Sequence, residues 1–239
     1  MANTHGVQIT WLGHAAFRMR SAGKIFYIDP FLNHNPRCPD NEKSPTAADA
    51  ILVSHGHGDH VGDAVPLAQR TQAKVVAMVE LAMYLAKQGL PSDQMIAMNK
   101  GGTVAVAGAK VTMVHAFHSS SAEQDGLPIY LGEPAGYVVE FAEGLRLYFA
   151  GDTAVFGDMR LIAELYRPTL ACLPIGGFYT MDPFEAAHAC GLLGVEAVIP
   201  MHYGTFPPLV GTPAELRKHL AAAGTPCEVL ELVPGHTLS

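Results

Sequence analysis

The amino-acid sequence predicts an α/β protein built as a four-layer αββα sandwich. Strand-type patterns and alternating helix–strand patterns occur in both halves of the chain, as expected for two packed sheets with helices outside. Of the 239 residues, 49% are hydrophobic and only 15% are charged, which suits a large buried core. No composition break or repeat divides the chain, so we expect one domain over residues 1–239.

The first part of the chain is rich in β-forming residues. A turn at Ser21-Ala22-Gly23 separates two of the expected strands, and a polar, Pro- and Asn-rich stretch at 30–46 predicts a long loop. Long loops in compact domains are often functional. Strands are expected at Val7–Trp11, Ala15–Arg20, Lys24–Asp29 and Ala50–Ser54.

Helix and strand signals alternate through the rest of the chain. Helices are expected at Ala64–Gln69, Leu81–Gln88, Asp158–Tyr166, Pro183–Leu193 and Pro213–Ala223. Strands are expected at Lys74–Met78, Thr103–Ala107, Lys110–His115, Tyr137–Phe141, Leu145–Ala150, Leu170–Pro174, Ala197–Met201 and Cys227–Leu232. Asp182-Pro183 and Thr212-Pro213, each followed by Glu at the third helical position, predict capping boxes for the last two helices.

The segment His55-Gly56-His57-Gly58-Asp59-His60 has the pattern HxHxDH and follows the apolar strand at 50–54. Imidazole and carboxylate groups bind first-row metal ions well, and the glycines allow a tight loop to turn the side chains inward. A loop of solvated histidines is the alternative interpretation. So many metal-binding groups in one short segment favour a metal site.

An HxHxDH motif after an apolar strand resembles the signature of the metallo-β-lactamase superfamily. Within it, the segments WLGHAAF at 11–17, IDP at 28–30 and PIGGFYTMDPFEAA at 174–187 are similar to the UlaG-like, UPF0173-type metal-dependent hydrolases. The resemblance covers the whole chain and implies the metallo-β-lactamase fold. It also implies three further metal ligands, for which the candidates are His118, Asp152 and His202.

The resemblance implies a binuclear site for two divalent ions. The first ion would be held by His55, His57 and His118, and the second by Asp59, His60 and His202, with Asp152 bridging the two. Zn²⁺ is the expected metal, and Mn²⁺, Fe²⁺ or Ni²⁺ would also fit the donor set. Such a site uses a metal-bridged hydroxide to attack a carbonyl or phosphoryl centre.

Three residues are candidates for catalysis beside the metals. Asp59 would orient the hydroxide, His14 would contact the substrate or support the ligands, and Tyr203 would donate to a developing oxyanion. His14 and Tyr203 are as readily explained as structural residues. His115 competes with His118 for the ligand position, and the His-Ser-Ser context favours His118. His236 has no assigned role.

The expected function is a metal-dependent hydrolase that acts on a small-molecule ester, lactone or phosphodiester. A non-catalytic metal-binding or regulatory protein, or a nuclease-type phosphodiesterase, is the alternative. The net charge of −7 gives no general reason to bind nucleic acid. We expect no secretory signal and no membrane span, and four widely spaced cysteines suggest a cytoplasmic protein. Nothing in the sequence bears on the oligomeric state.

Overall fold

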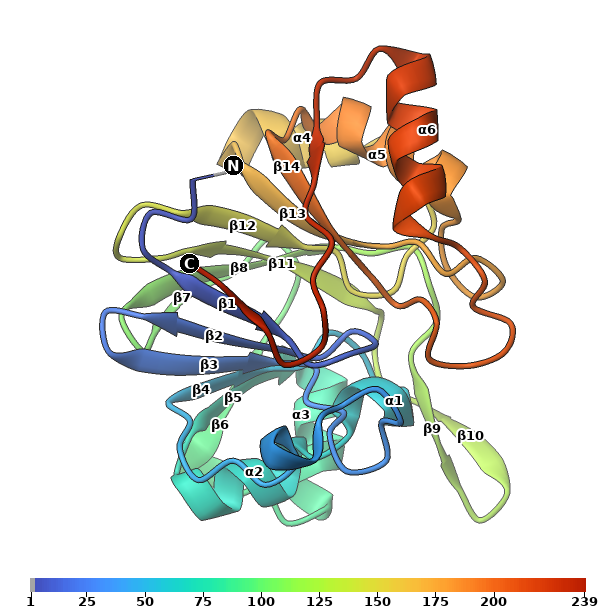
Figure 1. Ribbon diagram of the computed structural model, residues 1–239. Coiled ribbons are helices and arrows are strands. Elements are labelled where there is room, and N and C mark those ends of the chain that lie inside the picture. Colours follow the sequence, from blue (N-terminus) through green and yellow to red (C-terminus); the bar gives the residue numbers. More distant parts are fainter. Residues whose placement is uncertain (1–2) are drawn as a thin grey trace.

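Two seven-stranded sheets pack face to face at the centre of the molecule, and helices cover the outer faces (Figure 1). The computed structural model describes residues 3–239. In spatial order, the first sheet contains β16 (Thr237–Leu238), β1 (Gln8–Trp11), β2 (Phe17–Ser21), β3 (Lys24–Ile28), β4 (Ala50–Leu52), β5 (Lys74–Met78) and β6 (Met95–Met98). The second contains β15 (Glu228–Val229), β14 (Ala197–Met201), β13 (Leu170–Pro174), β12 (Arg146–Phe149), β11 (Ala135–Glu140), β8 (Ala109–His115) and β7 (Thr103–Val106).

The main core lies between the sheets. In β2, Phe17 and Met19 are buried while Arg20 is exposed, which is the alternation expected of a strand with one face on a core. Aromatic rings meet across the two sheets: Phe17 contacts Phe149 edge to face at a centroid distance of 6.0 Å, and Phe26 contacts Phe141 at 5.5 Å. The αββα sandwich predicted from the sequence is confirmed.

Each sheet combines an antiparallel part with a parallel part. Strands β1, β2 and β3 pair antiparallel, whereas β3 to β6 run parallel. The second sheet repeats this arrangement, with β7, β8, β11 and β12 antiparallel and β12 to β15 parallel. Parallel strands need crossover connections, and these connections place the helices on the outer faces.

The helices divide between the two outer faces (Figure 1). The first sheet carries α1 (Gly58–Val61), α2 (Ala64–Thr71) and α3 (Val79–Lys87), and the second carries α4 (Met159–Tyr166), α5 (Pro183–Leu193) and α6 (Pro213–Ala223). Short 3₁₀ helices occur at Asp40–Glu42 and Ser92–Gln94. Both predicted capping boxes are present: Asp182 accepts from the backbone N–H of Glu185, and Thr212 accepts from that of Glu215.

The structure contains elements that the sequence interpretation missed. Strand β6, the two-residue strand β16 and the hairpin formed by β9 (Ser121–Gln124) and β10 (Leu127–Tyr130) were not expected. Asp125-Gly126 forms the hairpin turn with φ of +54° and +77°, a known hairpin signal that the long polar segment obscured. The strand expected at Cys227–Leu232 is shorter, because only Glu228 and Val229 pair with β14.

Across residues 3–239, no helix combines the length and the hydrophobicity that crossing a bilayer requires.

Candidate metal centre

The metal-binding candidates come together at one edge of the sandwich, where several strands end. The HxHxDH segment follows β4, His118 follows β8, Asp152 follows β12 and His202 follows β14. His14 lies in the turn between β1 and β2. Side chains that are far apart in sequence therefore meet because the carboxyl ends of neighbouring strands share an edge.

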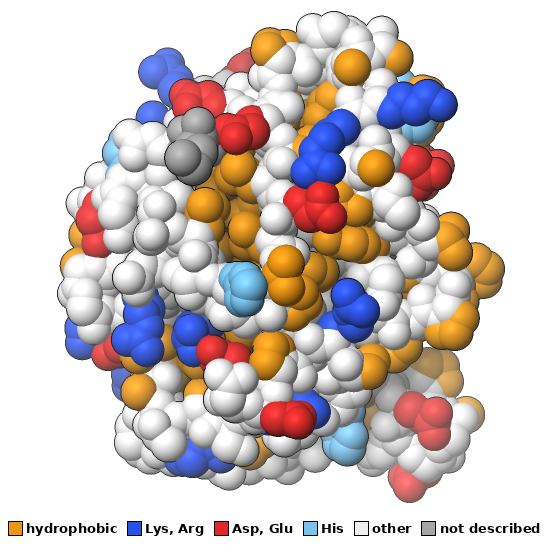
Figure 2. Space-filling view, viewed as in Figure 1, with side chains coloured by type: hydrophobic (Ala, Val, Ile, Leu, Met, Phe, Trp, Pro, Cys, Tyr) orange, Lys and Arg blue, Asp and Glu red, His pale blue; other side chains and the backbone are white. Residues whose placement is uncertain are grey.

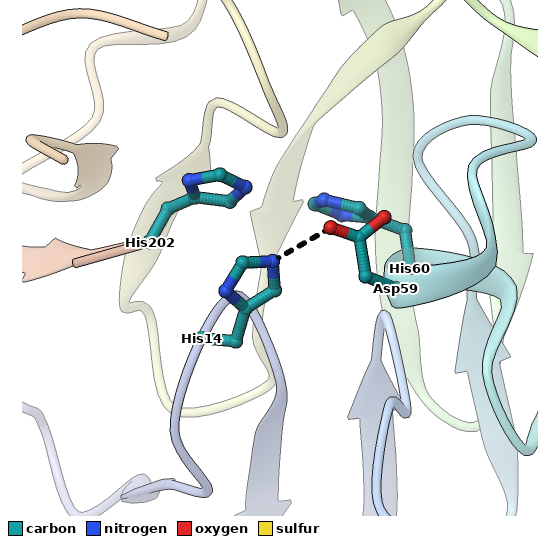
Figure 3. Close-up of side chains that lie close together, drawn as sticks. All are labelled: His14, Asp59, His60 and His202. Carbon is teal, nitrogen blue, oxygen red and sulfur yellow. Dashed lines mark hydrogen bonds and ion pairs between the residues drawn. The ribbon is translucent and has the colours of Figure 1, made fainter. Parts of the chain in front are cut away.

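One group of side chains is buried except for Asp59, which is partly exposed. It contains His14, Asp59, His60 and His202, whose nearest N and O atoms all lie within 4.8 Å of one another (Figure 3). His14 Nε2 lies 3.0 Å from Asp59 Oδ2, and burial lowers the pKa of His14 to about 4, so this imidazole is neutral near pH 7. We refer to these four residues as the buried cluster.

A second group contains His55, His57 and His118, and its ligand atoms also lie within 4.8 Å of one another. His55 Nε2 is 2.9 Å from His57 Nδ1. His57 and His118 are only partly buried, and burial lowers the pKa of both imidazoles, which favours the neutral form that binds metals. We refer to these three residues as the open cluster.

Asp152 lies between the two clusters. Its Oδ2 atom is 3.0 Å from His202 Nε2, 3.2 Å from His60 Nε2 and 3.8 Å from His118 Nε2. Burial opposes ionisation of Asp152, but His202 and His60 outweigh it and hold the pKa of this carboxyl well below its ordinary value. An anionic carboxylate in this position can be shared by ions bound at both clusters.

Several buried polar atoms at this point lack a hydrogen bond of normal geometry. They include Oδ1 of Asp152 and the Nε2 atoms of His60 and His202, which lie within ion-pair distance of Asp152 Oδ2 but do not form a hydrogen bond with it. Buried polar atoms are normally satisfied, so a group of them aimed at one place calls for an explanation. Imidazole nitrogens and a carboxylate oxygen are ligands for divalent cations, and these residues therefore fit a metal site.

Asp29 supports both clusters, a role that the sequence analysis did not identify. It is fully buried and accepts hydrogen bonds from Ser54 N at 2.7 Å, Ser54 Oγ at 2.6 Å and His60 Nδ1 at 2.7 Å. The Ser54 hydroxyl also lies 2.9 Å from His55 Nδ1. Asp29 therefore orients His60 directly and His55 through Ser54. The available signal was the IDP segment, which places a carboxylate at the end of β3.

Three of these residues have unusual backbone conformations. His14, Asp29 and His202 have φ of +56°, +45° and +56°, a left-handed region that non-glycine residues rarely adopt. The carbonyl oxygen of His14 accepts hydrogen bonds from His202 N and from the indole of Trp11, both at 2.9 Å. Strain of this kind is found where the surrounding structure holds a functional site in place.

A cavity of about 240 Å³ opens over both clusters. Its lining includes Ser119 and Tyr179 beside the metal-binding candidates. Tyr203 is not part of this lining, because its ring stacks on Trp11 at a centroid distance of 5.2 Å. The tyrosine at the cavity is thus Tyr179, so the oxyanion role predicted for Tyr203 has no geometric support.

The remaining histidines in question lie elsewhere. His115 Nδ1 is 3.0 Å from Lys100 Nζ, and its ring packs on Phe156. His236 is exposed in the C-terminal tail, where its backbone N–H donates to Val233.

Known proteins are similar to this chain in sequence and in fold. Residues 25–203 match the family model for the beta-lactamase superfamily domain. A UPF0173 metal-dependent hydrolase from Rubrobacter xylanophilus is 53% identical over 235 residues, which cover 98% of this chain and 96% of that protein. A second from Koribacter versatilis is 48% identical and covers 98% of both chains.

Solved structures of other proteins are also similar to this chain. Igni18, a metallo hydrolase from Ignicoccus hospitalis, is 36% identical with a TM-score of 0.83, covering 97% of each chain. An isothiocyanate hydrolase from Delia radicum gut bacteria has a TM-score of 0.72 at 19% identity, covering 97% of this chain and 98% of its own, and so shares the fold. The chain therefore belongs to the UPF0173 metal-dependent hydrolases of the beta-lactamase superfamily.

Proposed function

We propose that this hydrolase takes two divalent ions at its metal centre and cleaves a small-molecule ester, lactone or phosphodiester. The observation that carries the proposal is the pair of clusters that meet at Asp152. One ion would bind His55, His57 and His118, and the other Asp59, His60 and His202, with Asp152 shared. Zn²⁺ suits this His-rich donor set best, and Mn²⁺, Fe²⁺ and Ni²⁺ also fit it.

When bound, two divalent ions supply an activated water as nucleophile and polarise the scissile oxygen. The protein supplies orientation. Asp59 is held by His14 and still lines the cavity, so its carboxylate can orient the water. The exposed phenol of Tyr179 lines the same cavity and can donate to an oxyanion that develops on the substrate.

Metal removal tests the proposal. The protein is stripped with a chelator, reloaded with Zn²⁺ or Mn²⁺, and assayed in parallel on bis(p-nitrophenyl) phosphate, γ-butyrolactone and p-nitrophenyl acetate. We expect two ions per chain and metal-dependent turnover of at least one substrate. His188→Ala, on the outer surface of α5, serves as the control and should behave as wild type. Two bound ions without turnover of any of these substrates would contradict a hydrolytic role and favour a non-catalytic one.

A further inference from the structure

A groove continues from the metal cavity along the hairpin β9–β10, which projects beside the site (Figure 1). The groove has a volume of about 490 Å³ and shares His118 and Ser119 with the metal cavity. Pro128 and Tyr130 of the hairpin form one side, and Pro134 lies in the lining as well. A substrate bound at the metal centre can therefore extend into this groove, which we call the hairpin groove.

The hairpin groove offers mostly apolar and uncharged surface. Tyr130 is 68% exposed, so its ring stands in water unless something packs on it. An exposed aromatic ring beside a catalytic cavity is a common binding feature, since large apolar surfaces in water favour contact with a ligand. The adjoining side chains of Ser119, Ser120 and Ser121 are small and polar.

Lys and Arg are absent from the segments that line the groove and from those that follow β4, β12, β13 and β14. No Lys or Arg occurs in the segments 54–63, 111–145, 150–158, 174–186 and 202–216. The groove instead contains Glu133, and a neighbouring cavity beside His57 contains Glu123. Figure 2 shows acidic side chains on the projecting hairpin. Sites that recognise phosphate groups normally supply Arg, Lys or free backbone N–H groups at a helix start.

Lys100, beside the groove, and the start of helix α5 are already engaged. Lys100 donates to Glu133 at 2.6 Å and lies 3.0 Å from His115, so its ammonium group is neutralised by a carboxylate. Helix α5 begins just after Tyr179, but the carboxylate of Asp182 already caps its N-terminus. The one carboxylate that lines the groove is paired with Lys100, so the lining residues offer an anionic substrate group no unpaired cation.

We propose that the substrate is an uncharged carboxylic ester or lactone whose apolar part lies in the hairpin groove against Tyr130 and Pro128. This inference rests on the proposed function and narrows its substrate class. It places phosphorylated compounds outside the preferred substrates, because only the metal ions themselves would attract them.

The test measures kcat/KM of the zinc-loaded protein on p-nitrophenyl esters that share one leaving group. From the acetate to the pentanoate, we expect about a fourfold increase for each methylene that becomes buried in the groove. The pentanoate should exceed p-nitrophenyl hydrogen glutarate, which has the same acyl length and a negative end, by tenfold or more. It should also exceed bis(p-nitrophenyl) phosphate.

Substitutions in and beside the hairpin groove test whether the groove causes these substrate preferences. Tyr130→Ser should lower the pentanoate-to-acetate ratio at least threefold. Leu127→Ser is the matched control, since Leu127 lies on the same strand, is also 68% exposed and does not line the groove. It should retain the wild-type ratio. Glu133→Gln removes the carboxylate and releases Lys100, so it should reduce the preference for the pentanoate over the glutarate ester.

A binding measurement gives an independent result. In the zinc-loaded protein, 2-heptanone, an uncharged analogue of the ester, should shift backbone amide NMR signals of residues 118–134, and butyl phosphate should not shift those of the hairpin. A preference for the phosphodiester, or equal rates on acetate and pentanoate, would overturn this inference and leave the proposed function standing. Loss of all metal-dependent turnover would instead refute the proposed function together with the inference built on it.

Discussion

The two histidine clusters differ in how firmly the fold holds them. In the buried cluster, His14, His60 and His202 are each at most 2% exposed, and His60 lies between Asp29 and Asp152. In the open cluster, His57 and His118 are partly exposed and line the cavity, with Ser119 Oγ 3.5 Å from His57 Nε2. Three of the four residues in the buried cluster are thus almost inaccessible to solvent, whereas two of the three residues in the open cluster are partly exposed.

This difference in burial suggests that the two clusters contribute differently to folding and to metal binding. A buried ligand that is oriented by a second carboxylate binds metal in a preset geometry, which costs little reorganisation on binding. An exposed ligand can shift when substrate enters. We therefore expect substitutions of the three histidines in the buried cluster to affect folding and metal binding together. Substitutions of His57 and His118 should affect metal binding and activity with little effect on folding.

Asp152→Ala should have the largest effect, because it removes the carboxylate that both clusters share. We expect kcat to fall at least about 1,000-fold and bound metal to fall below one ion per chain, measured by steady-state kinetics and elemental analysis. Asp158→Ala, in the exposed loop before α4, is the control and should match the wild type. Full activity and full metal content in Asp152→Ala would refute the bridging role.

His60→Ala and His57→Ala compare the clusters directly through stability. The pKa of His60 is raised well above its ordinary value because the two carboxylates outweigh burial, so the imidazole is a cation between two anions. Removing it takes away a charged partner that Asp29 and Asp152 share and should cost about 3–5 kcal/mol in the metal-free protein. His57→Ala should cost less than about 1 kcal/mol, since the ring is partly solvated.

Urea denaturation of the metal-free variants gives these free energies. Because folding raises the pKa of His60, its stabilising contribution is complete below the ordinary value of 6.5 and declines as the pH rises through the folded-state pKa. The difference between the variants should therefore be larger at pH 6 than at high pH. Equal costs for both substitutions would show that the clusters are held alike.

Short sequence patterns predict many of the helices and strands. Two helices begin at Asp182-Pro183 and Thr212-Pro213 as the capping-box spacing predicts, because such chemistry acts within four residues. The strands expected at Tyr137–Phe141 and Leu145–Ala150 likewise pair as β11 and β12. The HxHxDH segment is equally local, and its three histidines and its aspartate all belong to the two clusters.

What escaped prediction depends on contacts between distant residues. Asp29 bonds to Ser54 and His60, which are 25 and 31 residues away, so no local pattern reveals the contact. Tyr203 is a candidate from the sequence because it adjoins His202, but its ring packs on Trp11, which is 192 residues away.

Gly176→Ala tests whether the backbone position of His202 matters for the buried cluster. A Cβ atom at Gly176 would overlap the carbonyl oxygen of His202, whose backbone is already in the left-handed region. We expect a loss of about 1–3 kcal/mol together with weaker metal binding at the buried cluster, measured by denaturation and by chelator competition. Gly157→Ala has no atom within 4 Å of the new methyl group and is the control. Unchanged metal affinity in Gly176→Ala would show that His202 tolerates displacement.

Thr212→Ala should have the smallest effect on stability and none on the metal centre. The Thr212 hydroxyl accepts from Glu215 N at 3.2 Å, and the Glu215 carboxylate accepts from Thr212 N at 3.1 Å. Losing this cap should cost about 1 kcal/mol of stability, measured by urea denaturation. Lys218→Ala, exposed on the same helix, should change stability by less than about 0.5 kcal/mol. Metal content and kcat should be unchanged in both variants, because α6 lies on the outer face of the second sheet and its cap serves only the helix. If Thr212→Ala released metal, the geometry of the buried cluster would depend on helix α6 as well as on Asp29 and Asp152.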